Sequence, residues 1–153
     1  MSIALRKATI NDITALAEMN KELIEDERSR NPMNVRQLQL RMQAWLDGNW
    51  SAIMISKNED LIGYLLYQQR EDDYYPEQRV IFVRQFFVQR GYRRRGIGRQ
   101  AFEEIAMRFF PSDAKVMLDV LSTNPEALRF WEDLGFRQYA TTLHRPPANA
   151  GLQ

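Results

Sequence analysis

Cysteine is absent from this 153-residue chain, and histidine occurs only once. The missing thiols exclude disulfide bonds, thiolate catalysis and cysteine-built zinc sites. No apolar run reaches the roughly 18 residues of a membrane-spanning helix, and the first residues lack the apolar core of a signal peptide. From these absences we expect a cytoplasmic protein that holds no metal and does not bind a membrane.

A strong net charge is also missing, since 21 basic and 20 acidic residues leave a balance of +1. That balance gives no global reason to expect a nucleic acid as a partner. The charge is nevertheless unevenly distributed, because five arginines fall between Arg90 and Arg99. With 44% apolar and 27% charged residues, the composition is that of a globular protein, and the length suits one domain.

The arginine-rich stretch lies between a predicted strand and a predicted helix. Before it, residues 80–88 are apolar, aromatic and β-branched, as in a strand. After it, apolar residues recur at helical spacing over residues 97–109, until Pro111 ends the pattern. Gly96 and Gly98 let backbone N–H groups approach a ligand at the positive end of this helix. With guanidinium groups beside it, the loop predicts a site for a phosphate or pyrophosphate.

The glycine loop resembles motif A of the GNAT N-acetyltransferase superfamily, whose core pattern is Gln/Arg-x-x-Gly-x-Gly/Ala. In this chain the core is Arg93-x-x-Gly96-x-Gly98. It departs from the longer family consensus at Arg90, in place of a proline, and at Arg94, in place of a glycine. After one further predicted strand, residues 124–136 resemble motif B, Asn-x-x-Ala-x-x-Phe/Leu-Tyr-x-x-x-Gly-Phe.

The resemblance implies a single-domain α/β (α+β) fold over residues 1–145, with a mixed central sheet of about six or seven strands and about four helices. Residues 146–153 are expected to form a flexible tail. The apolar patterns agree with this order and predict helices capped by Asn11 and Asn124, and another helix that begins near Asn34. The predicted strands cover residues 3–9, 50–56, 61–69, 80–88, 115–121 and 136–143.

Members of this family transfer an acetyl group from acetyl-CoA to an amine by direct attack within a ternary complex. The resemblance therefore implies acetyl-CoA as the cofactor, a small-molecule or peptide amine as the acceptor, and a homodimer. It also places the pyrophosphate on the glycine loop, pantetheine along the end of the preceding strand, and motif B near the thioester. The cofactor-binding residues expected are Phe86, Phe87, Val88, Arg93, Arg94, Arg95, Gly96, Ile97, Gly98, Arg99, Asn124 and Trp131.

An alkylamine arrives mostly protonated near neutral pH, so a base has to take its proton. By family position, Asp119 is the first candidate. Asp26, Glu27, Tyr74 and Tyr75 border the expected acceptor pocket and are alternatives, as bases or as contacts to the substrate. Acidic groups there would attract a polyamine, an aminoglycoside or a lysine side chain. A solvated helix end or an ordinary loop accounts for these residues equally well.

Trp131 stands where many relatives have a tyrosine near the thioester sulfur. Its indole N–H is a donor but not a useful acid, so the ring either holds the sulfur or packs against pantetheine. A thiolate with a pKa of about 8.5 is a tolerable leaving group, so the loss of the tyrosine does not exclude the reaction. Tyr139 and water are the alternatives for the acid step.

Three other functions fit parts of the sequence. Residues 96–101 also match the dinucleotide fingerprint, with Asp119 about 20 residues later, but a polar insert separates them from their strand. The arginine loop, with Tyr92 as a stacking residue, is a candidate nucleic-acid contact that the low net charge does not support. A non-catalytic acyl-CoA-binding sensor or interaction domain would keep the fold, and Trp131 favours it.

Overall fold

The computed structural model describes residues 2–93 and 95–149, and it shows one five-stranded sheet within them. In chain order and in sheet order, the strands are β1 (Ala4–Lys7), β2 (Ser51–Lys57), β3 (Asp60–Glu71), β4 (Arg79–Val88) and β5 (Lys115–Leu118). Neighbours from β1 to β4 are antiparallel, and β4 pairs with β5 in parallel. The predicted mixed α/β sheet is confirmed, with fewer strands than the about six or seven that were expected.

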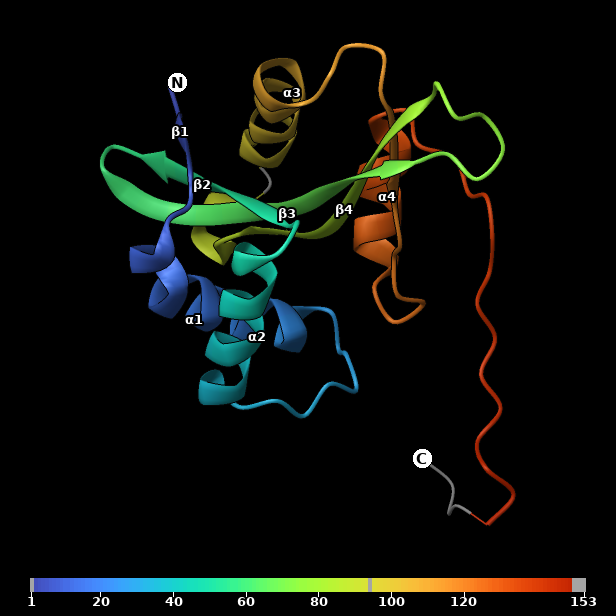
Figure 1. Ribbon diagram of the computed structural model, residues 1–153. Coiled ribbons are helices and arrows are strands. Elements are labelled where there is room, and N and C mark those ends of the chain that lie inside the picture. Colours follow the sequence, from blue (N-terminus) through green and yellow to red (C-terminus); the bar gives the residue numbers. More distant parts are fainter. Residues whose placement is uncertain (1, 94, 150–153) are drawn as a thin grey trace.

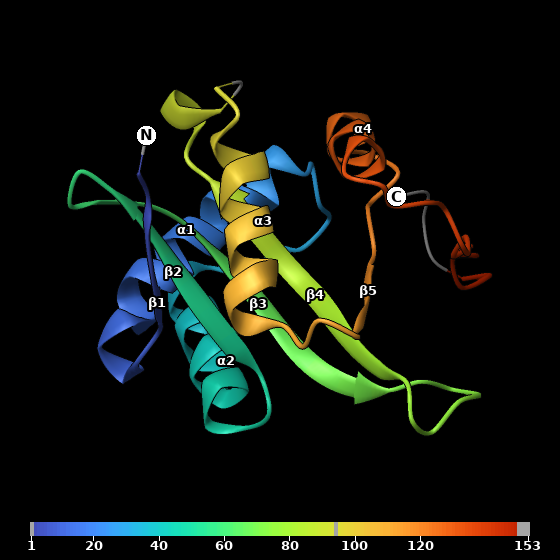
Figure 2. The ribbon, with the colours of Figure 1, turned by 90° about the horizontal axis from the view of Figure 1, so that it is seen from above.

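Helices cover both faces of this sheet (Figure 1 and Figure 2). Their bounds are α1 (Ile13–Asp26), α2 (Val35–Asp47), α3 (Ile97–Phe109) and α4 (Pro125–Asp133). Side chains of β2 alternate between the faces, with Ile53 and Ile55 in the core of α3 and α4, and Met54 in the core of α1 and α2. None of the helices in the described part of the chain is long and apolar enough to span a membrane.

The predicted cap of α4 by Asn124 is confirmed, and α2 begins after Asn34 as predicted. Asn34 and Asn124 each accept a hydrogen bond from a backbone N–H in the first turn of α2 and α4. The predicted cap of α1 by Asn11 is wrong, because Asn11 gives only its backbone N–H, which donates to the hydroxyl of Thr9. Thr9 caps the short 3-10 turn η1 (Ile10–Asp12) that precedes α1.

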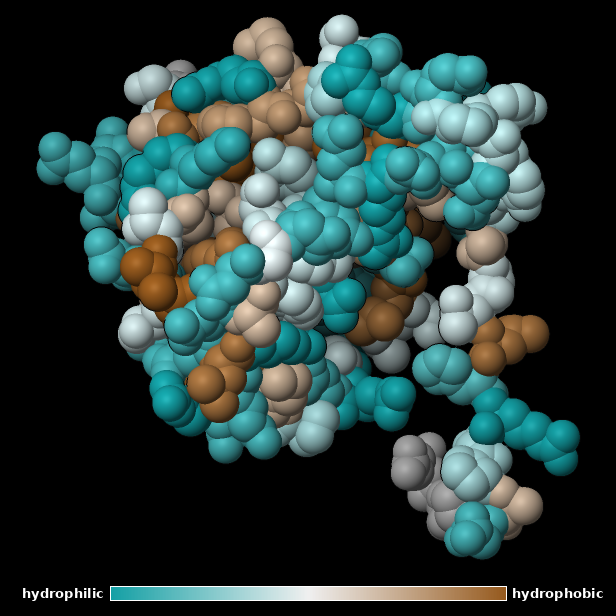
Figure 3. Space-filling view, viewed as in Figure 1, coloured by the Kyte–Doolittle hydropathy of each residue, from teal (hydrophilic) through white to brown (hydrophobic). Residues whose placement is uncertain are grey.

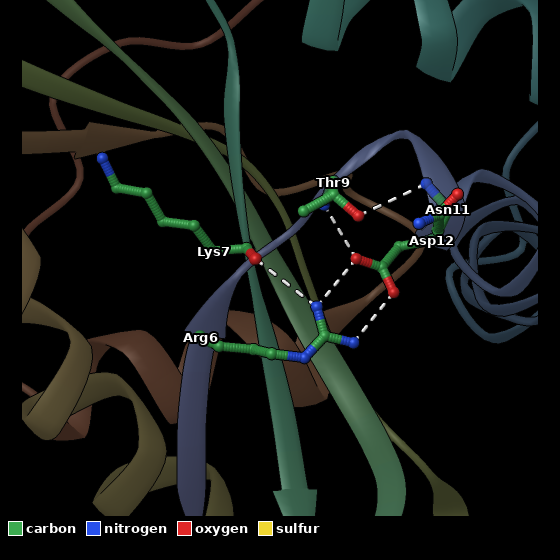
Figure 4. Close-up of polar contacts among 5 residues, drawn as sticks. All are labelled: Arg6, Lys7, Thr9, Asn11 and Asp12. Carbon is green, nitrogen blue, oxygen red and sulfur yellow. Dashed lines mark hydrogen bonds and ion pairs between the residues drawn. The ribbon is translucent and has the colours of Figure 1, made fainter.

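Asp12 joins β1 to the start of α1 (Figure 4). Its carboxylate accepts two hydrogen bonds from the guanidinium of Arg6, at 2.8 and 2.9 Å, and one from the backbone N–H of Thr9 at 2.8 Å. The hydrogen bonds from Arg6 lower the pKa of Asp12 below its ordinary value, although burial opposes them. This bidentate contact fixes the direction in which the chain enters α1.

The chain after α4 does not form the predicted strand over residues 136–143. Gly135, with a φ of 95°, ends α4, and the N–H of Phe136 bonds back to the carbonyl of Trp131. The chain then leaves the body (Figure 1 and Figure 3) without a ladder partner among the described residues. The prediction is wrong for a single chain, because a strand needs a hydrogen-bonded neighbour and this segment has none. The expected tail, residues 146–153, lies partly outside the described residues.

Candidate active site

The parallel strands β4 and β5 separate where their pairing ends. Their ladder runs from Val80–Lys115 to Val83–Leu118 and does not continue. At the same level β4 carries a bulge against β3, because Val83 and Gln85 pair with consecutive residues of β3 and leave Arg84 as the extra residue. A bulge bends its strand and increases the local twist, so it turns the end of β4 away from β5.

A pocket opens where these strands diverge. Five of its lining residues are among the predicted site residues: Glu27, Phe86, Asp119, Asn124 and Trp131. The others are Leu23, Val83, Arg84, Gln85, Leu118, Val120 and Ala127. The pocket therefore brings together the end of α1, the bulged half of β4, the segment after β5 and the inner side of α4.

Glu27 follows the last residue of α1 and is partly buried at the pocket. The hydroxyl of Thr123 donates to the backbone carbonyl of Glu27 at 2.6 Å, which ties this end of α1 to the segment before α4. Burial raises the pKa of the Glu27 carboxyl, and the nearby charge of Asp26 raises it further. A carboxyl whose pKa is raised inside a cleft has the properties of a general base.

Asp119 also lines the pocket, one residue beyond the end of β5, but its side chain is exposed. Tyr74 and Tyr75 lie elsewhere, in the loop between β3 and β4, where they are 77% and 67% exposed. Their backbone N–H groups donate to Asp72, which also binds Lys115 at 2.6 Å. The hydrogen bond from Lys115, followed by those from the two amides, lowers the pKa of Asp72 to about 2. The structure therefore brings Asp119 to the pocket and leaves Tyr74 and Tyr75 outside it.

Asp26 does not line the pocket, because two arginines of the glycine loop hold its carboxylate. Arg90 donates to it at 2.5 and 3.0 Å, and Arg93 donates to its other oxygen. Arg93 also donates from Nε to the carbonyl of Val88 at 2.6 Å. Burial would raise the pKa of Asp26, but the hydrogen bonds from Arg93 and Arg90 lower it below its ordinary value. Asp26 thus fastens the glycine loop to the end of α1.

The glycine loop enters α3 at Gly96, which has a φ of 76° in the left-handed region. Gly96 occupies the N-cap position, so no side chain caps the first amides of α3. Arg95 and Arg99 are exposed on either side, and Arg94 lies outside the described residues. Uncapped amides at a helix start beside two guanidinium groups fit a diphosphate.

Phe86 links the glycine loop to the pocket. A Cβ on Gly98 would lie 3.3 Å from the ring of Phe130 and 3.9 Å from that of Phe86, so the start of α3 packs against α4. The ring of Phe87 is buried on the other face, against α1, and Ile97 is buried in the core. These two residues reach a ligand only through their backbone.

Trp131 is 7% exposed and sits at the centre of an aromatic cluster on α3 and α4. Its ring lies edge to face with three others, at centroid distances of 5.1 Å for Phe102, 4.9 Å for Phe130 and 5.2 Å for Phe136. This packing fixes the wall of the pocket, and it agrees with a packing role for the indole.

Tyr64, Arg84 and Gln85 belong to the site but were not predicted. The hydroxyl of Tyr64 donates to Oε1 of Gln85 at 2.7 Å. Complete burial raises the pKa of Tyr64 well above its ordinary value, and the charge of Glu27 raises it further. The signal in the sequence was the polar pair Arg84-Gln85, which interrupts an otherwise apolar strand.

The model of a known protein family matches the part of the sequence that forms the pocket and the glycine loop. The model of the Acetyltransferase (GNAT) family matches residues 16–136, which contain both motifs and most of the pocket. The chain belongs to the GNAT acetyltransferase family. This GNAT protein is thereby separated from the dinucleotide-binding folds, which its mostly antiparallel sheet also excludes. Among curated proteins, no sequence matches the chain.

Solved structures share the fold over nearly the whole chain. A possible acetyltransferase from Clostridium difficile 630 has a TM-score of 0.78 at 17% identity, covering 98% of this chain and 100% of that one. Aminoglycoside N-acetyltransferase AAC(6')-Iy in complex with CoA has a TM-score of 0.75 at 14% identity, covering 96% and 95%. A predicted acetyltransferase with acetyl-CoA from Clostridium acetobutylicum has a TM-score of 0.73 at 14% identity, covering 95% and 96%. At these identities the likeness is one of fold.

Proposed function

We propose that this GNAT protein transfers an acetyl group from acetyl-CoA to a primary amine of a small molecule or peptide, by direct attack in a ternary complex. The observation that carries the proposal is the meeting of Glu27, Asp119 and Asn124 in one pocket beside the glycine loop. Family membership supports the transfer of an acetyl group, and two of the similar structures contain CoA or acetyl-CoA.

The glycine loop and the diverging strands are built to hold the cofactor. The uncapped amides after Gly96 and the exposed Arg95 and Arg99 bind the diphosphate, and β4 offers the backbone beyond Val83 to pantetheine. Bound there, acetyl-CoA supplies an activated acyl group. Arg93 has a positioning role, because its guanidinium is committed to Asp26 and to the carbonyl of Val88.

Glu27 is the general base of this proposal, and Asp119 is the second candidate. A carboxylate in the pocket takes a proton from the ammonium group, and the neutral amine attacks the thioester carbonyl carbon. The C–N bond forms, the C–S bond breaks, and the thiolate leaves with its electron pair and takes up the second proton that the nitrogen loses. Holding both reactants in one pocket lowers the barrier by at most about 7–11 kcal/mol.

The test of the proposal separates binding from turnover. We expect calorimetry to show binding of acetyl-CoA, and a thiol assay to show release of free CoA when amines are added. The amines to supply are amino acids, peptides, polyamines and aminoglycosides. A protein that does not bind acetyl-CoA would contradict the proposal.

A non-catalytic acyl-CoA sensor is the alternative that one observation favours. Trp131 replaces the family tyrosine and is enclosed by aromatic rings, so no hydroxyl stands at that position. Binding of acetyl-CoA without thiol release in the presence of any of these amines would favour the sensor over the enzyme.

Location and assembly belong to the same proposal. The absence of cysteine supports a reducing compartment, and we propose the cytoplasm. We also propose a homodimer, which the C-terminal segment that leaves the body supports (Figure 3).

A further inference from the structure

Two arginines and two tryptophans stack on one another where α2 packs against the sheet. The guanidinium carbon of Arg41 lies 4.4 Å from the ring centroid of Trp45, and that of Arg84 lies 4.7 Å from the same ring. Arg84 also lies 5.6 Å from Trp50. These four residues are the arginine–tryptophan cluster. Stacking on aromatic faces fixes both guanidinium groups without using their N–H donors.

The two positive charges of this cluster are not compensated. In the part of the chain that the structure describes, neither Arg41 nor Arg84 forms an ion pair with a carboxylate. Burial, and then the charge of Arg84, lowers the pKa of Arg41. Two like charges this close, without a counter-ion, are the electrostatic environment of an anion site.

Buried donors next to the cluster also lack an acceptor. Arg41 donates from Nη2 to Oδ1 of Asn20 at 3.2 Å. Nε of Arg41 and Nδ2 of Asn20 are both buried and have no hydrogen-bond partner among the described residues. Buried polar groups are nearly always hydrogen-bonded, so these two donors have hydrogen-bonding capacity that the described residues do not use.

Arg84 connects the cluster to the proposed active site. It is the extra residue of the bulge in β4, and it lines the same pocket as Glu27 and Asp119. Both charges act on the buried Tyr64, whose pKa is raised by Glu27 and lowered by Arg41. The pocket thus offers the carboxylates of Glu27 and Asp119 to a cation and the guanidinium of Arg84 to an anion.

We propose that the acceptor carries an anionic group, a carboxylate or a phosphoryl group, a few bonds from the amine that is acetylated. The anion binds Arg84, with Arg41 behind it, and the amine faces Glu27. The acceptor class is that of amino acids and related small zwitterions. Polyamines and aminoglycosides, which carry only positive charges, would bring a cation against two arginines. This inference rests on the proposed function, which it deepens by naming the acceptor.

The test compares acceptors that differ only in the anion. β-Alanine is paired with propylamine, and 2-aminoethyl phosphate with ethylamine, while putrescine and kanamycin represent the polycations. We expect kcat/KM for CoA release to be about 10- to 100-fold higher for the zwitterion of a pair, since hydrogen bonds to charged groups are the strong ones. Equal rates within both pairs, or a preference for the polycations, would overturn the inference.

A substitution of Arg84 tests whether this residue binds the anionic group: Arg84→Gln is compared with the control Arg70→Gln. Arg70 also lies over an aromatic ring, 4.0 Å from the centroid of Phe82, but it does not line the pocket. We expect Arg84→Gln to raise KM for the zwitterions about 10- to 100-fold, and to change kcat/KM for propylamine far less, because propylamine has no anion for Arg84 to bind. Arg70→Gln should change none of these. An equal loss for zwitterion and plain amine would contradict the assignment.

A binding measurement distinguishes failure of this inference from failure of the proposed function. Trp45 and Trp50 flank Arg84, so their fluorescence reports on the cluster when CoA-saturated protein is titrated with β-alanine or 2-aminoethyl phosphate. Saturable binding that Arg84→Gln removes supports the anion site even without turnover, and then only the proposed function fails. No binding of either zwitterion would overturn the anion site, even where plain amines are acetylated.

Discussion

Two adjacent carboxylates at the end of α1 have opposite surroundings. Asp26 accepts hydrogen bonds from Arg90 and Arg93, whereas no cation of the described chain pairs with the carboxylate of Glu27. The pKa of Asp26 is therefore low and that of Glu27 is raised by burial. Neighbouring acids whose pKa values are driven apart take different roles, and we propose a structural role for Asp26 and a catalytic role for Glu27.

Substituting Glu27→Gln tests the catalytic role of this residue. We expect kcat to fall about 10²- to 10⁴-fold, because the ammonium group loses its proton acceptor, while the affinity for acetyl-CoA stays the same. In the unmodified protein, activity should fall as pH drops through the raised pKa of Glu27, and the variant should lose this acid limb. The pH–rate profile of each protein is the measurement.

Asp119→Asn is the matched control for that substitution, because Asp119 is the other carboxylate of the pocket. If Glu27 is the base, the Asp119→Asn variant retains the acid limb of the pH–rate profile and most of the wild-type kcat. The opposite pattern, an unchanged profile in Glu27→Gln and a lost limb in Asp119→Asn, would assign the base to Asp119.

At the scale of elements, the start of α3 depends on one backbone conformation. Gly96→Asp puts a side chain at a φ of 76° and a negative charge beside the first amides of α3. We expect acetyl-CoA affinity to fall at least about 100-fold, while the strain lowers stability by only about 1–2 kcal/mol, since nothing lies within 4 Å of the added Cβ. Calorimetry and thermal unfolding measure the two effects.

Gly91→Asp is the control for this prediction. Gly91 lies in the short turn η2 (Arg90–Tyr92) and also has open space around it. Its substitution by aspartate adds the same charge to the same loop. It should weaken binding only slightly, because it is not at the helix start. Similar losses in both variants would mean that general charge, and not the amides of α3, holds the cofactor.

The elements that the sequence predicted well are those decided by neighbouring residues. α2 and α4 begin at Asn34 and Asn124 because a cap acts within its own first turn. The strand expected over residues 136–143 failed because a strand also needs a partner from elsewhere in the chain. For the same reason Arg84 was missed: its position depends on the register of β4 against β3, which no local pattern shows.

In the candidate site, too, contiguous residues could be predicted, and residues brought together from distant segments could not. Both motifs could be recognised because loop, helix start and cap are contiguous, so the positions of Gly96 and Asn124 at the starts of α3 and α4 could be predicted. The partial burial of Glu27 depends on the packing of α1 against the segment that contains Thr123, nearly a hundred residues later. Asp26 was expected near the acceptor, but two arginines from the glycine loop hold it. Such long-range pairings decide which carboxylate is available for chemistry.

At the scale of the whole molecule, the sheet edge at β5 and one segment of the chain both lack a partner among the described residues. β5 is the last strand of the sheet, and its outer side has no neighbour among the described residues. Residues 137–143 leave the body with exposed side chains, including Tyr139 at 83% and Leu143 at 87%. An open edge is a template for a strand from another chain. We therefore expect the segment of each protomer to pair with β5 of the other in the proposed homodimer.

Proline substitutions test this assembly, because proline removes a backbone donor. Alternate residues of an edge strand bond to its neighbour, so either Thr141→Pro or Thr142→Pro must remove a bond from the ladder between protomers. We expect light scattering to give twice the mass of one chain for the unmodified protein, and the mass of a single chain for at least one proline variant at the same micromolar concentration. Thr141→Val, which keeps the donor and favours a strand, should stay dimeric. Since the segment makes no ladder within its own chain, thermal unfolding of a monomeric variant should remain cooperative. A single-chain mass for the unmodified protein, or unchanged dimers in both proline variants, would show that this segment does not hold two copies together.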